Sequence, residues 1–109
     1  AQIAACPPLQ PARAVRDTAI AAVLLVDAQI DHATGLMTLR EHRARLPVHC
    51  TPSVHADLTT GYPLLRVLES YCGVDWHPID AVNEKPFAIE GLPGLELRPL
   101  PIPGEAPPY

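Results

Sequence analysis

Four polar side chains in the stretch D-A-Q-I-D-H have types and spacing suited to binding a metal ion. Asp27, Gln29, Asp31 and His32 follow directly after an apolar run. Carboxylate oxygens, an amide carbonyl and a neutral imidazole are all good ligands for a divalent cation. Because alternate residues of an extended chain point to one side, Asp27, Gln29 and Asp31 could converge, with His32 turning in at the start of a helix. The spacing therefore predicts a divalent-metal site.

The same stretch is also compatible with a purely structural role. Asp31 would then be the N-cap of the following helix, where its carboxylate accepts a backbone hydrogen bond. His32 would form only local hydrogen bonds. The spacing alone leaves both interpretations open.

A buried strand and a helix must position these side chains. The continuous apolar run over residues 20–26 predicts a strand over residues 18–26 that is buried on both faces. Residues 27–32 are predicted to be a loop, and residues 33–43 a helix with a solvated basic end. The basic residues of that end are Arg40, His42, Arg43 and Arg45. The end of a buried strand, just before a helix, is where α/β enzymes place their chemistry.

A second strand and two helical pieces follow. Residues 46–50 are predicted to form a short strand, after which Thr51 caps a helix with Pro52 at its first position. A further helical piece over residues 62–71 is predicted to end at Gly73. The residues expected on the buried faces of these helices are Val54, Leu58, Leu64, Leu65, Leu68 and Tyr71.

The order of the elements indicates the fold class. Short strands are expected at residues 74–79 and 86–89, and an edge strand at residues 95–102. Strand, helix, strand, helix pair and strand meander together predict an α/β fold with a mixed sheet and helices on one face. Before the first strand, the end of a helix over residues 1–6 and a connector over residues 7–17 are expected. The chain, residues 1–109, is expected to be a single partial domain.

Composition argues against several classes of protein. The chain has 8 Lys and Arg against 12 Asp and Glu, so no basic surface for nucleic acid is expected. Its longest apolar run is far shorter than the roughly 20 residues that cross a bilayer, so no membrane span is expected. Cys6, Cys50 and Cys72 are widely spaced, which indicates small core residues rather than disulfides or zinc ligands, and favours a cytoplasmic location.

The remaining histidines and two aromatic residues are predicted to be structural. His42, His49, His55 and His77 show no metal-ligand spacing and are expected to lie at the surface or to be satisfied by hydrogen bonds. Trp76 and Tyr71 are expected to be core aromatics.

The sequence around His32 resembles the signature of the metallo-β-lactamase superfamily. That signature is H-x-H-x-D-H at the end of an apolar strand, followed by a helix start that contains glycine. Asp31 and His32 match its last two positions and Gly35 follows, whereas Asp27 and Gln29 stand where the first two histidines would be. Within the superfamily, essentially the whole chain resembles the coenzyme PQQ synthesis B family. The matching segments are LVDAQIDHATGL, LREH, LPVHCT, DLTTGYPLL, WHPI, GLPGLELRPLPI and APPY.

This resemblance implies a partial αβ/βα sandwich and a place in the synthesis of pyrroloquinoline quinone (PQQ), the redox cofactor of bacterial quinoprotein dehydrogenases. Family members are much longer, so the resemblance also implies a central fragment. A part with a cysteine-rich structural zinc site is expected before Ala1, and further metal-ligand motifs after Tyr109. PQQ or its precursor and other PQQ-biosynthesis proteins are the partners that the family implies.

The activity implied for the intact protein is a metal-dependent oxygenase that hydroxylates a tyrosine of the peptide-derived precursor. Asp27 and Gln29 in place of histidines leave an oxygen-rich set that favours iron, with manganese or zinc as further candidates. Asp31 and His32 are the expected ligands, and Asp27 and Gln29 would bind the metal or support its ligands.

Two alternatives stay open: a carrier that takes PQQ or its precursor to the periplasm, and a truncated, inactive α/β domain. For the isolated chain, weak metal affinity is expected because the set of ligands is incomplete. A dimer or larger assembly is expected because an interrupted sheet exposes edges.

Overall fold

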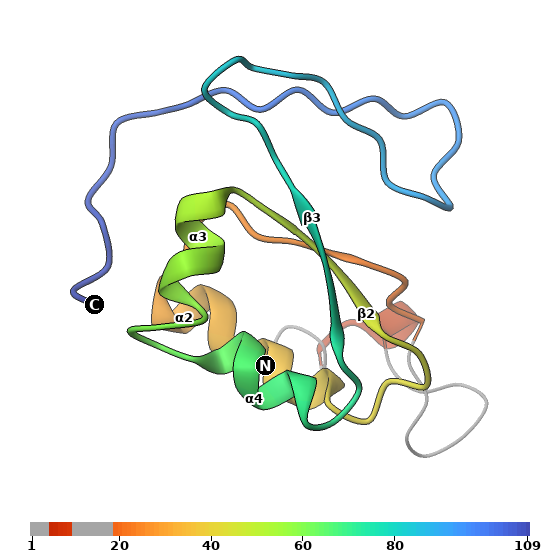
Figure 1. The fold of residues 1–109 in the computed structure, drawn as a ribbon. Coiled ribbons are helices and arrows are strands. Elements are labelled where there is room, and N and C mark those ends of the chain that lie inside the picture. The colour runs from red at the N-terminus through yellow and green to blue at the C-terminus, as the bar shows by residue number, and fades with distance from the viewer. Residues whose placement is uncertain (1–4, 10–18) are drawn as a thin grey trace.

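A three-stranded parallel sheet lies at the centre of the computed structural model, which describes residues 5–9 and 19–109 (Figure 1). The strands, in their order across the sheet, are β1 (Val23–Leu24), β2 (Leu46–Cys50) and β3 (Val74–Pro78). In the register of the sheet, Val48 of β2 lies between Val23 of β1 and Trp76 of β3. The prediction of an α/β fold is therefore confirmed.

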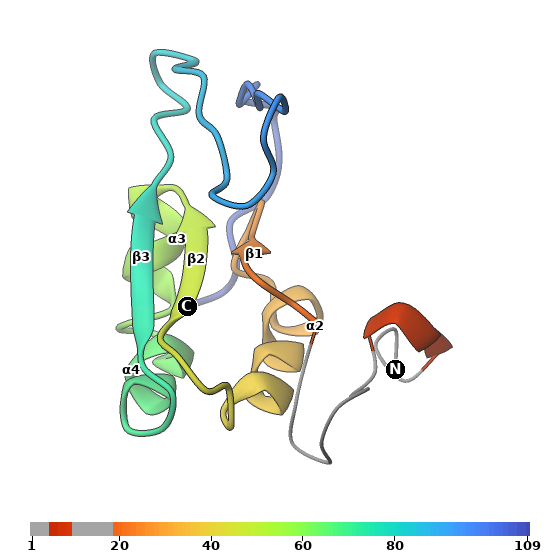
Figure 2. The ribbon, with the colours of Figure 1, turned by 90° about the vertical axis from the view of Figure 1, so that its right-hand side faces the viewer.

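Helical segments make both crossovers between these parallel strands, as parallel pairing requires. The described helical segments are η1 (Pro7–Leu9), α2 (Ile30–Ala33), η2 (Thr34–Leu39), α3 (Pro52–Asp57) and α4 (Leu64–Glu69), where η denotes a 3₁₀ helix. Figure 2 shows α2, α3 and α4 behind the sheet, all on the same face, as predicted. No helix among the described residues is long and apolar enough to cross a membrane.

The core lies between the sheet and the helices. Every second side chain of β2 faces the helices. These side chains are Leu46, Val48 and Cys50, and all three are fully buried. The other members of the core cluster are Leu25, Ala28, Ala33, Leu36, Leu39, Val54, Leu58, Leu64, Leu65 and Leu68. Trp76 packs against this cluster and its indole N–H donates to the Cys50 carbonyl at 3.1 Å, so it is a core aromatic as predicted.

The predicted start of α3 and the glycine that closes α4 are confirmed, although α4 spans Leu64–Glu69 and not the predicted residues 62–71. Thr51 is the N-cap of α3, its hydroxyl accepts from the Val54 N–H at 3.4 Å, and Pro52 follows at the first helical position. After α4, Gly73 has φ +82° and its N–H donates to the Leu68 carbonyl at 3.0 Å. The positive φ of Gly73 favours glycine, and a Cβ there would lie 2.6 Å from a guanidinium nitrogen of Arg45, whose side chain would have to move.

The first strand is shorter and more exposed than its apolar run predicted. Within the part of residues 18–26 that the structure describes, only Val23 and Leu24 join the ladder. Leu25 is 7% exposed, but Leu24 is 41% and Val26 83% exposed, so the expected burial on both faces is wrong. Described helices cover one face only, so an apolar run here does not mean two buried faces.

The helix predicted over residues 33–43 also differs. It begins at Ile30, tightens into a 3₁₀ helix from Thr34 and ends at Leu39. Gly35 and Thr38 disfavour the α-helix, and the Thr38 hydroxyl donates to the Gly35 carbonyl at 2.7 Å.

Arg45 therefore lies beyond the helix and is not part of a solvated helix end. Its guanidinium lies 2.8 Å from the carboxylates of both Glu69 and Asp75. Because all three side chains are about half exposed, these pairs add little stability.

The strands predicted at residues 86–89 and 95–102 do not form. One antiparallel bridge between Phe87 and Leu97 is found in their place. Prolines interrupt this region, and each removes a backbone donor that a ladder would need. The described sheet itself is entirely parallel, so antiparallel pairing is limited to this bridge.

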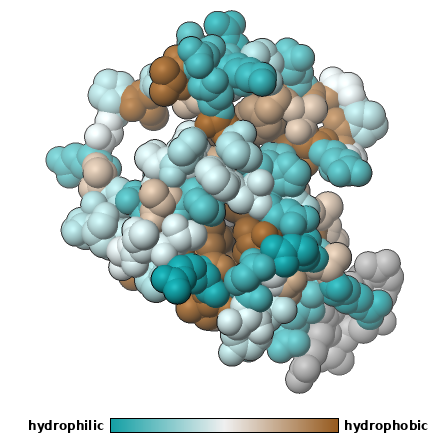
Figure 3. Space-filling view, in the orientation of Figure 1, coloured by the Kyte–Doolittle hydropathy of each residue, from teal (hydrophilic) through white to brown (hydrophobic). Residues whose placement is uncertain are grey.

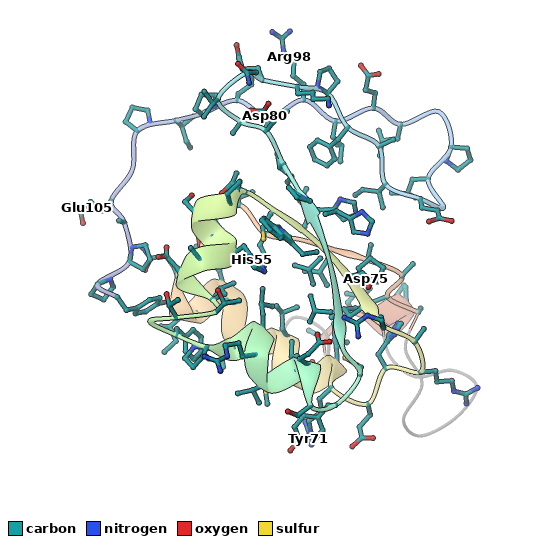
Figure 4. All side chains as sticks on the ribbon, viewed as in Figure 1. His55, Tyr71, Asp75, Asp80, Arg98 and Glu105 are labelled. Carbon is teal, nitrogen blue, oxygen red and sulfur yellow. The ribbon has the colours of Figure 1, made fainter. Side chains whose placement is uncertain are left out.

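Two further predictions lie elsewhere in the chain. Tyr71 is 58% exposed and points away from the molecule in Figure 4, so its assignment to the core is wrong. Most of the helix end predicted over residues 1–6 and most of the connector over residues 7–17 lie outside the described residues.

Candidate functional site

The turn after β1 is organised by the carboxylate of Asp27. One of its oxygens accepts from the Gln29 N–H at 3.0 Å, which closes a short turn before α2. The carboxylate oxygens also lie 2.8 and 3.0 Å from Nδ1 of His32. Because a carboxylate only accepts, His32 donates from Nδ1, and its Nε2 is left for another partner.

This contact shifts the pKa of both groups in opposite directions. The hydrogen bond from His32 holds the pKa of Asp27 below its ordinary value of 3.8. In turn, the hydrogen bond to Asp27 raises the pKa of His32 above 6.5, and the charges of Asp27 and Asp31 add to that rise. The side chains of His32 and Asp27 are 55% and 38% exposed, so water screens the pair.

Asp31 is the second carboxylate near the imidazole. Its Oδ2 lies 3.8 Å from Nε2 of His32, and its side chain is 78% exposed. Two ligands at about 2.1 Å from one metal ion lie roughly 3 to 3.5 Å apart. Asp31 and His32 could therefore share a cation after a small side-chain adjustment. Asp27, bound to the other ring nitrogen, has the position of the carboxylates that orient metal-binding histidines.

Gln29 does not join this group. Its side-chain amide donates to the Glu105 carbonyl at 3.5 Å, away from Asp27 and His32. The expected convergence of alternate residues is wrong because the ladder ends at Leu24 and α2 begins at Ile30, so the backbone between Asp27 and Asp31 is not a strand.

The structural alternative is correct only in part. Asp31 lies in the first turn of α2, and the N-cap is Gln29, which makes no side-chain cap hydrogen bond. His32 does form the local hydrogen bond that this alternative required.

The donor set falls short of a complete metal centre. Over residues 5–9 and 19–109, no group of three or more His, Cys, Asp or Glu side chains is arranged to hold a metal ion. Protein metal sites use at least about three protein ligands. Asp31 and His32 supply two, so these residues by themselves do not fit a resident metal.

The C-terminal residue reaches this turn, which the sequence did not predict. The Tyr109 hydroxyl donates to the carbonyl of Ala28, although the two residues are 81 positions apart. The ring of Tyr109 lies 5.8 Å from that of Tyr62, and the Tyr62 hydroxyl lies 2.8 Å from the hydroxyl of Thr34. Figure 1 shows the C-terminal segment returning toward α2 and α3.

Gly61 makes room for this return. A Cβ at Gly61 would lie 2.9 Å from atoms of Tyr109, closer than two such atoms can approach. Burial raises the pKa of the Tyr109 hydroxyl, and the nearby Tyr62 and carboxylates of Asp57 and Asp27 add to the rise, so the phenol stays a hydrogen-bond donor. The glycine was visible in the sequence, but nothing in the sequence connected it with residue 109.

The other histidines make local contacts. His42 lies 2.8 Å from the Ala44 carbonyl and 3.2 Å from that of Ile20. The His55 ring stacks on Trp76 with 3.7 Å between centroids, and the His49 ring stacks on His77 at 4.5 Å. All three cysteines are free, and burial raises the pKa of the Cys50 thiol to about 11, as expected for a core residue.

Comparison with known proteins decides the family. A model described as the beta-lactamase superfamily domain matches residues 1–108. The chain belongs to the β-lactamase superfamily. This membership agrees with the parallel sheet and with the D-H pair of α2, the first helix after β1.

Relatives of this superfamily member share the name coenzyme PQQ synthesis protein B. The protein of Nitrosococcus oceani is 56% identical over 94% of the chain, and that of Azotobacter vinelandii is 54% identical over all of it. The protein of Methylobacillus flagellatus is 47% identical over 99% of the chain. In each case the match covers 35% of the relative, so the chain spans about a third of the length of these curated relatives.

Proposed function

We propose that this protein acts in PQQ biosynthesis, as the central part of a metal-dependent oxygenase that hydroxylates a tyrosine of the peptide-derived precursor. The observation that carries the proposal is the 47–56% identity, over at least 94% of the chain, to proteins named for PQQ synthesis. The reaction takes one oxygen atom of O₂ into a C–H bond. The other atom leaves as water, with two electrons and two protons from a reductant.

In this proposal, Asp31 and His32 are metal ligands in the intact protein. Asp27 orients the imidazole through the Nδ1 hydrogen bond of 2.8 Å, which would leave Nε2 available as the ligand atom. Gln29 acts as support for the turn rather than as a ligand. The remaining ligands come from residues outside these 109.

Two other functions are supported by specific features. The replacement of the first two signature histidines by Asp27 and Gln29 favours a carrier that keeps affinity for PQQ or its precursor without catalysis. Only two candidate metal ligands lie close together, and the chain matches only 35% of the length of its relatives. Both observations favour an inactive domain when the chain is isolated.

The metal assignment is tested in a full-length frame. The matching segment of the Nitrosococcus oceani protein is replaced by this chain, and iron per protein is measured after loading with Fe²⁺. We expect D31A and H32A to lower the iron content at least fivefold. The control variants E90A and H77A, which remove a carboxylate and an imidazole elsewhere, should leave it unchanged. Unchanged iron in both D31A and H32A would refute the assignment.

A second measurement separates the oxygenase from the carrier. The loaded chimera is titrated with precursor peptide without oxygen, and is then exposed to O₂ and a reductant such as ascorbate. A mass gain of one oxygen atom in the peptide supports the oxygenase, whereas binding with no change in mass supports the carrier.

A further inference from the structure

A pocket of about 720 Å³ opens at the carboxyl ends of β2 and β3, and the proposed metal site does not use it. One wall comes from the first residues of α3, and the other from the segment that follows β3. Its larger apolar lining residues are Pro52, Pro78, Ile79, Val82, Pro86 and Phe87. In α/β proteins, the carboxyl edge of a parallel sheet is where ligands bind, and this volume lies in the usual range of about 300–1,000 Å³ for ligand pockets.

Most polar groups in the lining already have partners. The Thr51 hydroxyl caps α3 and lies 3.1 Å from the hydroxyl of Ser53. The carboxylate of Asp80 accepts from the backbone N–H of Asn83 at 3.1 Å and from its side-chain amide at 2.8 Å. These bonds lower the pKa of Asp80, so it stays ionised and fixes the turn.

Lys85 is different, because it is the single lysine of the sequence and lines the pocket. Its backbone N–H donates to the Asp80 carbonyl at 3.0 Å, which holds it at the end of this turn. Within the described part of the chain, its ammonium has no carboxylate within 4.0 Å, although its charge contributes to lowering the pKa of Asp80. Residues 80–102 form a lobe above the sheet, and its other cation is Arg98. Arg98 lies 3.9 Å from Glu84 and points away from the molecule in Figure 4.

The lining also exposes apolar side chains to water. Val82 is 92% exposed, and Phe87 is partly exposed beside it in the lining. Figure 3 shows separate brown, hydrophobic residues among teal, hydrophilic ones over this lobe at the top of the molecule. An apolar wall with one ammonium group is suited to an amphipathic anion. The fixed charge of Asp80 disfavours ions with several negative charges.

We propose that this pocket binds a small organic carboxylate with an apolar body. The carboxylate lies at the Lys85 ammonium, and the apolar body covers Val82 and Phe87. The proposal does not depend on the metal site, because none of Asp27, Asp31 and His32 lines the pocket.

The test uses three probes with the 109-residue chain: 2-naphthoate, its neutral amide 2-naphthamide, and acetate. Binding is followed by NMR shifts of backbone amides and methyl groups. We expect 2-naphthoate to shift Ile79, Val82, Lys85 and Phe87, and to bind at least fivefold tighter than either of the other probes. The reason is that the amide lacks the charge and acetate lacks the apolar body. Raising the salt concentration should weaken the naphthoate but not the amide.

Two matched variants locate the anion. K85M should reduce the affinity for 2-naphthoate to that for the amide. R98M removes the same charge from the same lobe and should leave the affinity within twofold. Lys85 is exposed, so K85M should fold, which its amide spectrum will show. Equal affinity for the three probes, shifts confined to other surfaces, or equal effects of K85M and R98M would overturn the proposal.

Discussion

Nδ1 of His32 lies 2.8 Å from a carboxylate oxygen of Asp27, five residues earlier in the chain. Asp27 also accepts the Gln29 N–H, so one carboxylate both closes the turn after β1 and orients the imidazole. The superfamily signature has histidine at the position of Asp27. In this chain, therefore, the residue at that position holds His32 instead of presenting an imidazole of its own.

The first prediction concerns the charge of His32. Asp27 raises the pKa of His32, so D27N should bring it back toward 6.5, whereas D31N should lower it less because Asp31 acts only through its charge. NMR titration of the imidazole measures this directly. An unchanged His32 pKa in D27N would mean that the pair does not exist in solution.

The same pair sets the direction of a pH effect on stability. The folded-state pKa of His32 is raised, so its contribution is present below about 6.5 and is lost as the pH rises through the folded value. The folded-state pKa of Asp27 is lowered, so its contribution is present above about 3.8 and is lost as the pH falls through the folded value. The pair should therefore stabilise the fold most between these two ordinary values.

The second prediction concerns the contact between Tyr109 and Ala28. Y109F removes the hydroxyl that donates to the Ala28 carbonyl and should lower the free energy of unfolding by about 1 kcal/mol. It should also shift the amide resonance of Gln29, which follows that carbonyl. Y71F is the matched control, because Tyr71 is 58% exposed and should change neither quantity. Equal effects of Y109F and Y71F in urea unfolding would contradict the contact.

The elements that the sequence predicted correctly have local signals. β2 matches residues 46–50, Thr51 and Pro52 mark the start of α3, and Gly73 closes α4. The signals are the side-chain pattern of β2, the cap of α3 and the positive φ of Gly73. Residues close in the sequence determine each of them.

The features that were missed depend on distant contacts. How much of β1 is buried depends on what covers its second face, which its own apolar run does not reveal. The packing of Tyr109 against Tyr62 and Gly61 joins segments more than 40 residues apart. The predicted convergence of side chains after the first strand was wrong, because the strand ladder ends at Leu24 and the side chain of Gln29 turns to Glu105.

The third prediction concerns self-association, which the exposed edge of the sheet favours. Leu24, Val26 and Ile30 are 41%, 83% and 57% exposed, and they lie within seven residues at β1 and the turn after it. V26E should shift a dimer or larger assembly toward the monomer in light scattering. V82E places the same charge at another exposed valine and should leave the assembly unchanged. A wild-type chain that is already monomeric would refute the prediction.

The last prediction concerns His49, the buried polar side chain of β2, which is 5% exposed. Its ring stacks on His77 and Phe87, and burial lowers its pKa below 6.5, with the charge of His77 adding to the effect. Below about pH 6.5, the imidazole of His49 binds a proton in the unfolded chain but not in the folded chain. The free energy of unfolding therefore decreases as the pH is lowered, until the pH passes the folded-state pKa of His49. H49F keeps a stacked ring without the titration, so the loss of stability between about pH 7.5 and 5.5 should become smaller. H77F should reduce that loss by a lesser amount, because it removes only the neighbouring charge. Urea unfolding at the two pH values measures both effects, and a pH dependence that H49F leaves intact would show that His49 titrates normally in the folded chain.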